Sequence, residues 1–155
     1  MDQIIRDYLV SSAEVKRNVA NQCITSIVDA VSVLSTVFAS GGKILTCGNG
    51  GSAADSQHIA AEFISLLSKD HYRPAMPAIA LTTDTSVVTA FSNDFDFDGV
   101  FERQVQALAK PGDALIGIST SGNSSNVIKA VKAAGKASVK TIVLTGSTEG
   151  ELSKL

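Results

Sequence analysis

Apolar side chains recur at helical spacing through residues 1–40, which predicts two consecutive helices. The apolar stripes of the two helices are formed by Ile4, Tyr8, Val15 and Val19, and by Ile24, Ile27, Val28, Val31, Leu34, Val37 and Phe38. Gly41 and Gly42 stop the second helix. The stripes are wide and contain no residues suited to catalysis or ligand binding. We therefore expect these helices to cover a sheet and to pack against partner helices in an oligomer.

Between residues 41 and 155, short apolar runs alternate with helical patterns. The runs predict strands at 43–47, 77–81, 114–118 and 139–144, and the segments between them predict helices at 52–67, 85–91, 99–109 and around 126–134. Strands that are apolar throughout and alternate with helices indicate an α/β fold with a parallel sheet covered on both faces. The chain is expected to be a single domain, with residues 1–40 as a helical pair and 41–155 as the α/β core.

Local polar signals predict where some of these elements begin and end. Ser52 and Asp55 resemble a capping box with Asp in place of Glu. Asp98 is expected to cap the helix that starts at residue 99. Residues 92–94 and the Pro111-Gly112 pair are predicted as turns.

The composition is that of an ordinary globular protein, with 155 residues, 45% hydrophobic residues and a formal net charge of −2. No basic patch is present, which argues against nucleic acid as a partner. No stretch has the pattern of a membrane span, and the N-terminus does not read as a signal peptide. Cys23 and Cys47 are not spaced like the cysteines of a disulfide framework, so a reducing cytoplasm is the expected location. No membrane partner is expected.

A glycine-rich turn between the first predicted strand and the following helix is the first candidate for function. It comprises Gly48, Asn49, Gly50 and Gly51. Glycine lets the backbone turn sharply and approach a ligand, and free N–H groups at a helix start favour a polar or anionic one. The turn matches neither the G-x-G-x-x-G fingerprint nor a P-loop, so a dinucleotide or nucleoside triphosphate is not favoured.

His58 and Glu62 stand four residues apart and therefore lie on one face of the predicted helix. They are either a base and an acceptor, two metal ligands, or a solvated pair with no catalytic role. The remaining histidine, His71, lies in a charged loop and is expected at the surface. Cys47 ends an apolar strand and is expected to be a packed thiol.

A loop of hydroxyl residues after the third predicted strand is the second candidate. Residues 119–124 read Ser-Thr-Ser-Gly-Asn-Ser and precede a helix start. Hydroxyl and N–H groups at such a place can bind a phosphate, although Ser and Thr also cap helices and shape turns. Four hydroxyls exceed what capping requires, so phosphate binding is favoured.

Four groups of residues, in one order along the chain, resemble the SIS (sugar isomerase) fold family. They are residues 47–52, His58 with Glu62, residues 93–95, and residues 117–124, followed by matches at 127–130 and 144–146. The resemblance covers the whole chain. It implies a three-layer α/β/α sandwich of flavodoxin-like topology, and a homotetramer packed through the N-terminal helices with active sites at subunit interfaces.

The resemblance also implies roles for individual residues. Substrate contacts are expected from Asn49, Gly50, Gly51, Ser52, His58, Glu62, Asn93 and Asp94, and phosphate contacts from Ser119, Thr120, Ser121 and Ser124. His58 and Glu62 are zinc ligands in family members that bind metal, and Glu62 corresponds to the proton-transferring base. The family has a fifth strand and a final helix that supplies a Gln and a His, and these are not in the sequence as it stands to Leu155.

The implied activity is that of an aldose–ketose isomerase that converts sedoheptulose 7-phosphate to D-glycero-D-manno-heptose 7-phosphate, the first step of ADP-heptose and lipopolysaccharide core biosynthesis. Two alternatives stay open. One is a non-enzymatic SIS protein that binds the bacterial replication initiator, although the position of Glu62 is not acidic in that relative. The other is a domain that senses sugar phosphates, which needs the hydroxyl loop but neither His58 nor Glu62.

Overall fold

The computed structural model describes residues 1–147 and 150–155. The chain divides into two compact units, Met1–Val33 and Leu34–Leu155. Each unit is described by itself.

The first unit consists of helix α1 (Asp2–Gln22) and the first part of α2 (Ile24–Ala39), which confirms the predicted pair of helices. None of the residues of α1, all of which the structure describes, is buried. Its exposed large apolar side chains are Ile4, Ile5, Tyr8, Leu9, Val10, Val15 and Val19. No single helix in the described ranges has the length and apolarity to cross a membrane; α1 and α2 pass that test only when taken together, as a pair bent by 73°.

The second unit is built on a four-stranded sheet. Its strands are β1 (Ile44–Gly48), β2 (Ala78–Ala80), β3 (Ala114–Ser119) and β4 (Lys140–Thr145). All neighbouring strands are parallel, and their order is β2-β1-β3-β4. Every residue of the central strands β1 and β3 is buried, which is why both read as continuous apolar runs in the sequence.

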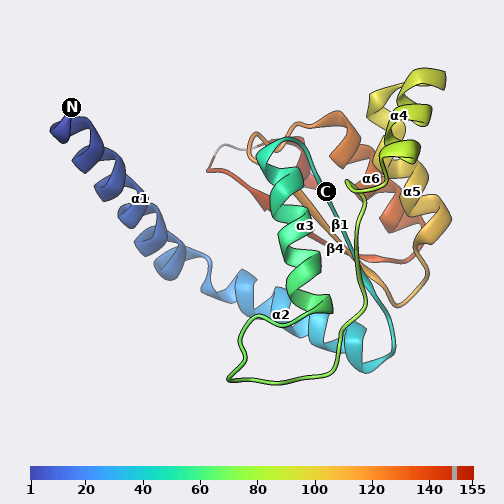
Figure 1. Cartoon of the computed structure of the whole chain (residues 1–155), viewed down its shortest axis with the longest axis horizontal. Helices are drawn as coiled ribbons and strands as arrows, with labels where there is room; N and C mark the ends of the chain where they lie inside the picture. Colours follow the sequence, from blue (N-terminus) through green and yellow to red (C-terminus); the bar gives the residue numbers. More distant parts are fainter. Residues whose placement is uncertain (148–149) are drawn as a thin grey trace. The chain divides into compact units, whose positions relative to one another are not determined.

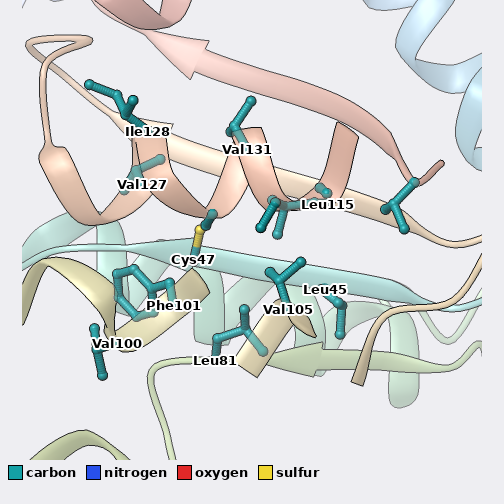
Figure 2. Close-up of a cluster of buried hydrophobic side chains, with 14 of the residues drawn as sticks. Leu45, Cys47, Leu81, Val100, Phe101, Val105, Leu115, Val127, Ile128 and Val131 are labelled. Carbon is teal, nitrogen blue, oxygen red and sulfur yellow. The ribbon is translucent and has the colours of Figure 1, made fainter. Parts of the chain in front are cut away.

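Helices cover both faces of this sheet, which confirms the three-layer fold (Figure 1). Side chains alternate along β1, so Ile44 faces α3 (Gly51–Ile64), whereas Leu45 and Cys47 face α5 (Val100–Leu108) and α6 (Ser125–Lys136). Figure 2 shows the second of these clusters, in which Cys47 lies among apolar side chains of both helices. At Gly117 a Cβ atom would lie 3.0 Å from Val127, so glycine lets α6 approach β3 closely.

Two predictions for the segment around α4 are wrong. Helix α4 (Thr85–Asp94) continues through residues 92–94, where a turn was predicted, because no glycine or proline interrupts it. The Asp98 cap is wrong as well. Asp96 is the residue that accepts a hydrogen bond from the Gly99 N–H, at 2.6 Å, and it thereby caps the short 3₁₀ helix η1 (Phe97–Gly99). The turn at Pro111-Gly112 is confirmed.

The start and end of α3 also differ from prediction. Its N-cap is Gly50, with a φ of 58°, so Ser52 lies inside the helix and the capping box is wrong. The helix ends at Ile64 and not at residue 67. Arg73 explains the early end, because its guanidinium donates to the carbonyl oxygens of Glu62 and Phe63 at 2.5 and 2.8 Å.

Candidate active site

The two candidate loops lie at the same end of the sheet, beside its two central strands. The connection after β1 leads toward β2 at one edge, and the connection after β3 leads toward β4 at the other. The carboxyl ends of β1 and β3 therefore form the topological switch point, where open α/β sheets bind ligands. Gly48 at the end of β1 is in register with Ile118 of β3, which brings the glycine turn (48–51) beside the hydroxyl loop (119–124).

The glycine turn requires glycine at two positions for different reasons. At Gly48 a Cβ atom would lie 2.7 Å from the Ser52 carbonyl oxygen, so the chain passes too close to the helix start for any side chain. Gly50 has a positive φ of 58°, which other residues adopt at a cost. The turn lines a small hollow of about 140 Å³ together with Ala53 and Thr82. Thr82 belongs to the polar loop 82–86 after β2, which the sequence also places at the ligand-binding end of the sheet, although no residue of this loop is among the expected site residues.

Two hydroxyl side chains of the hydroxyl loop lie against each other. Ser119 is 3% exposed and its Oγ lies 2.9 Å from the Oγ of Ser124. Ser124 occupies the N-cap position of α6, yet in the described part of the chain its side chain makes no capping hydrogen bond. Thr120 and Ser121 are exposed. The capping interpretation therefore does not describe Ser124, whose hydroxyl faces another hydroxyl.

The hydroxyl loop is held in place by the segment that follows β4. The N–H of Gly146 donates to the Thr120 carbonyl, and the N–H of Leu152 donates to the Gly122 carbonyl, each at 3.0 Å. Leu152, in the short 3₁₀ helix η2 (Glu151–Lys154), is buried in the main hydrophobic cluster. The loop is thus anchored to the core before any ligand arrives, which reduces the entropy lost on binding.

His58 and Glu62 form a pair on α3, as their spacing predicts. The Nε2 of His58 lies 3.3 Å from Oε1 of Glu62, and the two side chains are 73% and 33% exposed. The second carboxylate oxygen of Glu62, Oε2, is buried and has no hydrogen-bond partner among the described residues. A buried carboxylate oxygen without a partner is costly, and such a group is a candidate for binding a ligand.

The donor set for a zinc ion is incomplete in the described residues. Zinc sites use four ligands, or three with a water or substrate in the fourth position. His58 and Glu62 supply two, and no group of three His, Cys, Asp or Glu residues with metal-site geometry exists in ranges 1–147 and 150–155. These residues by themselves therefore do not make a zinc site.

Asn93 and Asp94 lie in the last turn of α4, where the Asn93 Nδ2 donates to the Asp94 Oδ1 at 2.9 Å. Asp94 lines a different cavity, of about 740 Å³, formed by α4, α5 and β2. Among the interactions that the structure gives for its described residues, none joins this pair or the His58–Glu62 pair to the hydroxyl loop. The chain by itself thus presents the predicted site residues as three separate groups.

Two further expectations about single residues are confirmed. Cys47 is fully buried, and burial raises the pKa of its thiol to about 12. It therefore stays protonated and is a packed thiol. His71 is exposed in the loop before β2.

Comparison with known proteins agrees with this architecture. Residues 7–146 match the family described as the SIS domain. A phosphoheptose isomerase of Nitratidesulfovibrio vulgaris (strain Hildenborough) is 47% identical over 153 residues, which is 99% of this chain and 73% of that protein. A phosphoheptose isomerase of Roseiflexus sp. (strain RS-1) is 50% identical over 146 residues, which is 94% of this chain and 73% of that protein.

A solved structure extends the comparison to three dimensions. The phosphoheptose isomerase from Neisseria gonorrhoeae has a TM-score of 0.92 and 43% sequence identity, covering 99% of this chain and 79% of that one. The chain therefore belongs to the SIS domain family. The relatives to which it is similar within that family carry the name phosphoheptose isomerase.

Proposed function

We propose that this protein is an aldose–ketose isomerase that converts sedoheptulose 7-phosphate to D-glycero-D-manno-heptose 7-phosphate. The observation that carries the proposal is the Glu62 carboxylate, which has one buried oxygen without a partner beside His58. The names of the relatives support the substrate. On this proposal the protein works in the cytoplasm, in the first step toward ADP-heptose.

Glu62 acts as the base in this proposal. It removes a proton from C1 of the ketose, the electron pair of that C–H bond forms the C1–C2 double bond, and the π electrons of the C2 carbonyl move to O2 to give an enediolate. Glu62 then returns the proton to C2, while the hydroxyl proton on O1 moves to O2 as the C1 aldehyde forms. The sum is an isomerisation with no external oxidant or reductant. A carboxylate suits this role when it lies within hydrogen-bond reach of the substrate carbon's proton.

The hydroxyl loop holds the phosphate at the other end of the substrate. Ser119, Thr120, Ser121 and Ser124 offer hydroxyl donors, and the first N–H groups of α6 lie beside them. Binding energy from this remote group orients C1 and C2 for proton transfer. Gly50, Gly51 and Ser52, with Asn49, would contact the sugar.

Zinc and the tetramer are part of the proposal through the family resemblance. His58 and Glu62 would be two of the zinc ligands, and the ion, when bound, would polarise the substrate carbonyl. The exposed apolar side chains of α1 are what a helix buried between subunits requires. A homotetramer built on α1 and α2 would give sites at subunit interfaces, and it would let Asn93 and Asp94 contribute to a site with residues of another subunit.

An isotope-exchange assay tests the function directly. The protein is incubated with sedoheptulose 7-phosphate in deuterium oxide, and the sugar is followed by nuclear magnetic resonance. We expect a new aldose phosphate and deuterium at C1 or C2. Binding of the sugar phosphate without exchange would instead identify a sensing domain, and absence of binding would contradict both.

A further inference from the structure

A reciprocal pair of amide hydrogen bonds spans the switch point. Asn49 Nδ2 donates to Asn126 Oδ1 at 2.8 Å, and Asn126 Nδ2 donates to Asn49 Oδ1 at 2.9 Å. Asn49 belongs to the glycine turn and is half-buried, whereas Asn126 lies in the first turn of α6 and is 3% exposed. The pair thus connects the glycine turn to the start of α6, directly after the hydroxyl loop, and on the proposed function these two segments bind opposite ends of one substrate.

The stability of α6 alone does not account for an asparagine at this position. Residue 126 is not the N-cap, which is Ser124, and the next residues, Val127 and Ile128, are buried and apolar. Burying an amide is unfavourable unless its hydrogen bonds are made. Asn126 meets that condition through Asn49, a residue of the opposite loop.

The amide pair also joins the two outer layers of the fold. Helix α3 covers one face of the sheet and α6 covers the other, and each begins at the carboxyl end of a central strand. The amide pair therefore ties the glycine turn to the start of α6, directly after the hydroxyl loop. Each amide keeps one N–H and one oxygen lone pair, but only Asn49 has a surface that a ligand can reach.

We propose that Asn126 is a positioning residue that holds the glycine turn, through Asn49, at the separation from the hydroxyl loop that one sugar phosphate requires. The inference rests on the proposed function. It predicts that Asn126 matters for a ligand that contacts both loops and not for one that contacts the hydroxyl loop alone. Sedoheptulose 7-phosphate would contact both loops, whereas inorganic phosphate would contact the hydroxyl loop alone.

Calorimetry with these two ligands tests the inference. In Asn126→Leu, which keeps the side-chain size and removes both hydrogen bonds, the Kd for sedoheptulose 7-phosphate should rise about tenfold. The Kd for inorganic phosphate should stay within about twofold of the wild-type value. Asn126→Ser has a side chain too short to reach Asn49. It should likewise raise the Kd for sedoheptulose 7-phosphate and leave the Kd for inorganic phosphate nearly unchanged, and it replaces the leucine variant if that variant does not fold.

Gln104 supplies the matched control. It is also a buried amide, 8% exposed, and its Nε2 donates to the carbonyl oxygens of Leu81 and Val100, which belong neither to the glycine turn nor to the hydroxyl loop. Gln104→Leu should lower stability yet leave both dissociation constants unchanged. A loss of affinity from a general weakening of the core would appear in this variant too.

A double-mutant cycle with Asn49→Ala completes the test, because a residue that acts only through Asn49 should have no further effect once Asn49 is gone. Additive losses of sedoheptulose 7-phosphate affinity would overturn the proposal. So would an equal loss for both ligands in Asn126→Leu, or no loss for either. Wild-type protein that fails to bind sedoheptulose 7-phosphate would instead contradict the proposed function, so the two failures are distinguishable.

Discussion

Two acidic side chains of the second unit have opposite surroundings. Asp113 precedes β3 at the amino end of the sheet and is 3% exposed. Its carboxylate accepts hydrogen bonds from the Lys43 Nζ at 2.5 Å, the Lys43 N–H at 2.9 Å and the Lys110 N–H at 2.8 Å. Burial disfavours the charged form, but these hydrogen bonds outweigh it and lower the pKa of Asp113.

Glu62 is the opposite case. One of its oxygens lies beside His58, and the other is buried with no partner in the part of the chain that the structure describes. A carboxylate whose hydrogen bonds are all made within the fold stabilises the fold, whereas one with an unused oxygen can act on a ligand. The comparison therefore favours a structural role for Asp113 and, on the proposed function, a catalytic role for Glu62. Replacing each acid by its amide tests both roles.

The largest effect should come from Glu62→Gln, which keeps the size of the side chain but cannot accept a proton. Turnover of sedoheptulose 7-phosphate should fall by at least ~10²-fold, the usual scale for removal of a general base. The variant should still fold, and its phosphate binding should be unchanged because the hydroxyl loop is untouched. Proton exchange at C1 or C2 at the wild-type rate would remove Glu62 from the mechanism.

Asp113→Asn should show the reverse pattern. The amide cannot satisfy Lys43 and the two backbone N–H groups together, so the free energy of unfolding should drop by about 3 kcal/mol. Urea denaturation measures this as a lower midpoint with an unchanged slope. The turnover number of the folded fraction should match wild type, and a selective loss of turnover would contradict the assignment.

A third variant examines the hydroxyl loop without touching either acid. Ser119→Ala combined with Ser121→Ala should weaken sugar-phosphate binding by about 1–3 kcal/mol, the cost of lost hydrogen bonds to a charged group. Calorimetry reports the change, with Ser153→Ala in η2 as a hydroxyl control outside the loop. Equal affinities for the double variant and wild type would rule out phosphate binding by these residues.

The smallest effect is a pH dependence of stability. Because the folded-state pKa of Asp113 lies below its ordinary value of 3.8, its contribution is fully present above that value. The contribution is lost as the pH falls through the lower folded-state pKa. The stability difference between wild type and Asp113→Asn should therefore be constant at neutral pH and shrink below about pH 4. If the stability difference between the two proteins instead grew as the pH fell, the folded-state pKa of Asp113 would not be lowered.

Sequence patterns predicted the fold well where the pattern lies entirely within one strand or one helix. Strands β1 and β3 read as apolar runs because both of their faces are buried, and the i, i+4 spacing of His58 and Glu62 is a property of any helix. Prediction failed where two local signals compete. Asp96 and Asp98 are both reasonable caps, and the backbone after α4 decides between them.

The site was predictable only in part, for the same reason. The glycine turn and the hydroxyl loop are contiguous motifs, so they can be found by reading along the chain. Asn126 has no such signal, because its partner Asn49 is 77 residues away. Arg73 likewise lies in a polar loop, and only the folded chain shows that it ends α3 beside Glu62.

The sequence by itself determined the order and type of the elements, the parallel sheet and the positions of the two candidate ligand-binding loops, because these follow from periodicity and from the geometry of neighbouring residues. The tertiary structure decided which polar groups have their hydrogen bonds satisfied. Asp113 and Glu62 are both carboxylates in an apolar fold, and no local pattern separates them. Their difference depends on Lys43 and Lys110, which the fold brings to one carboxylate and not to the other.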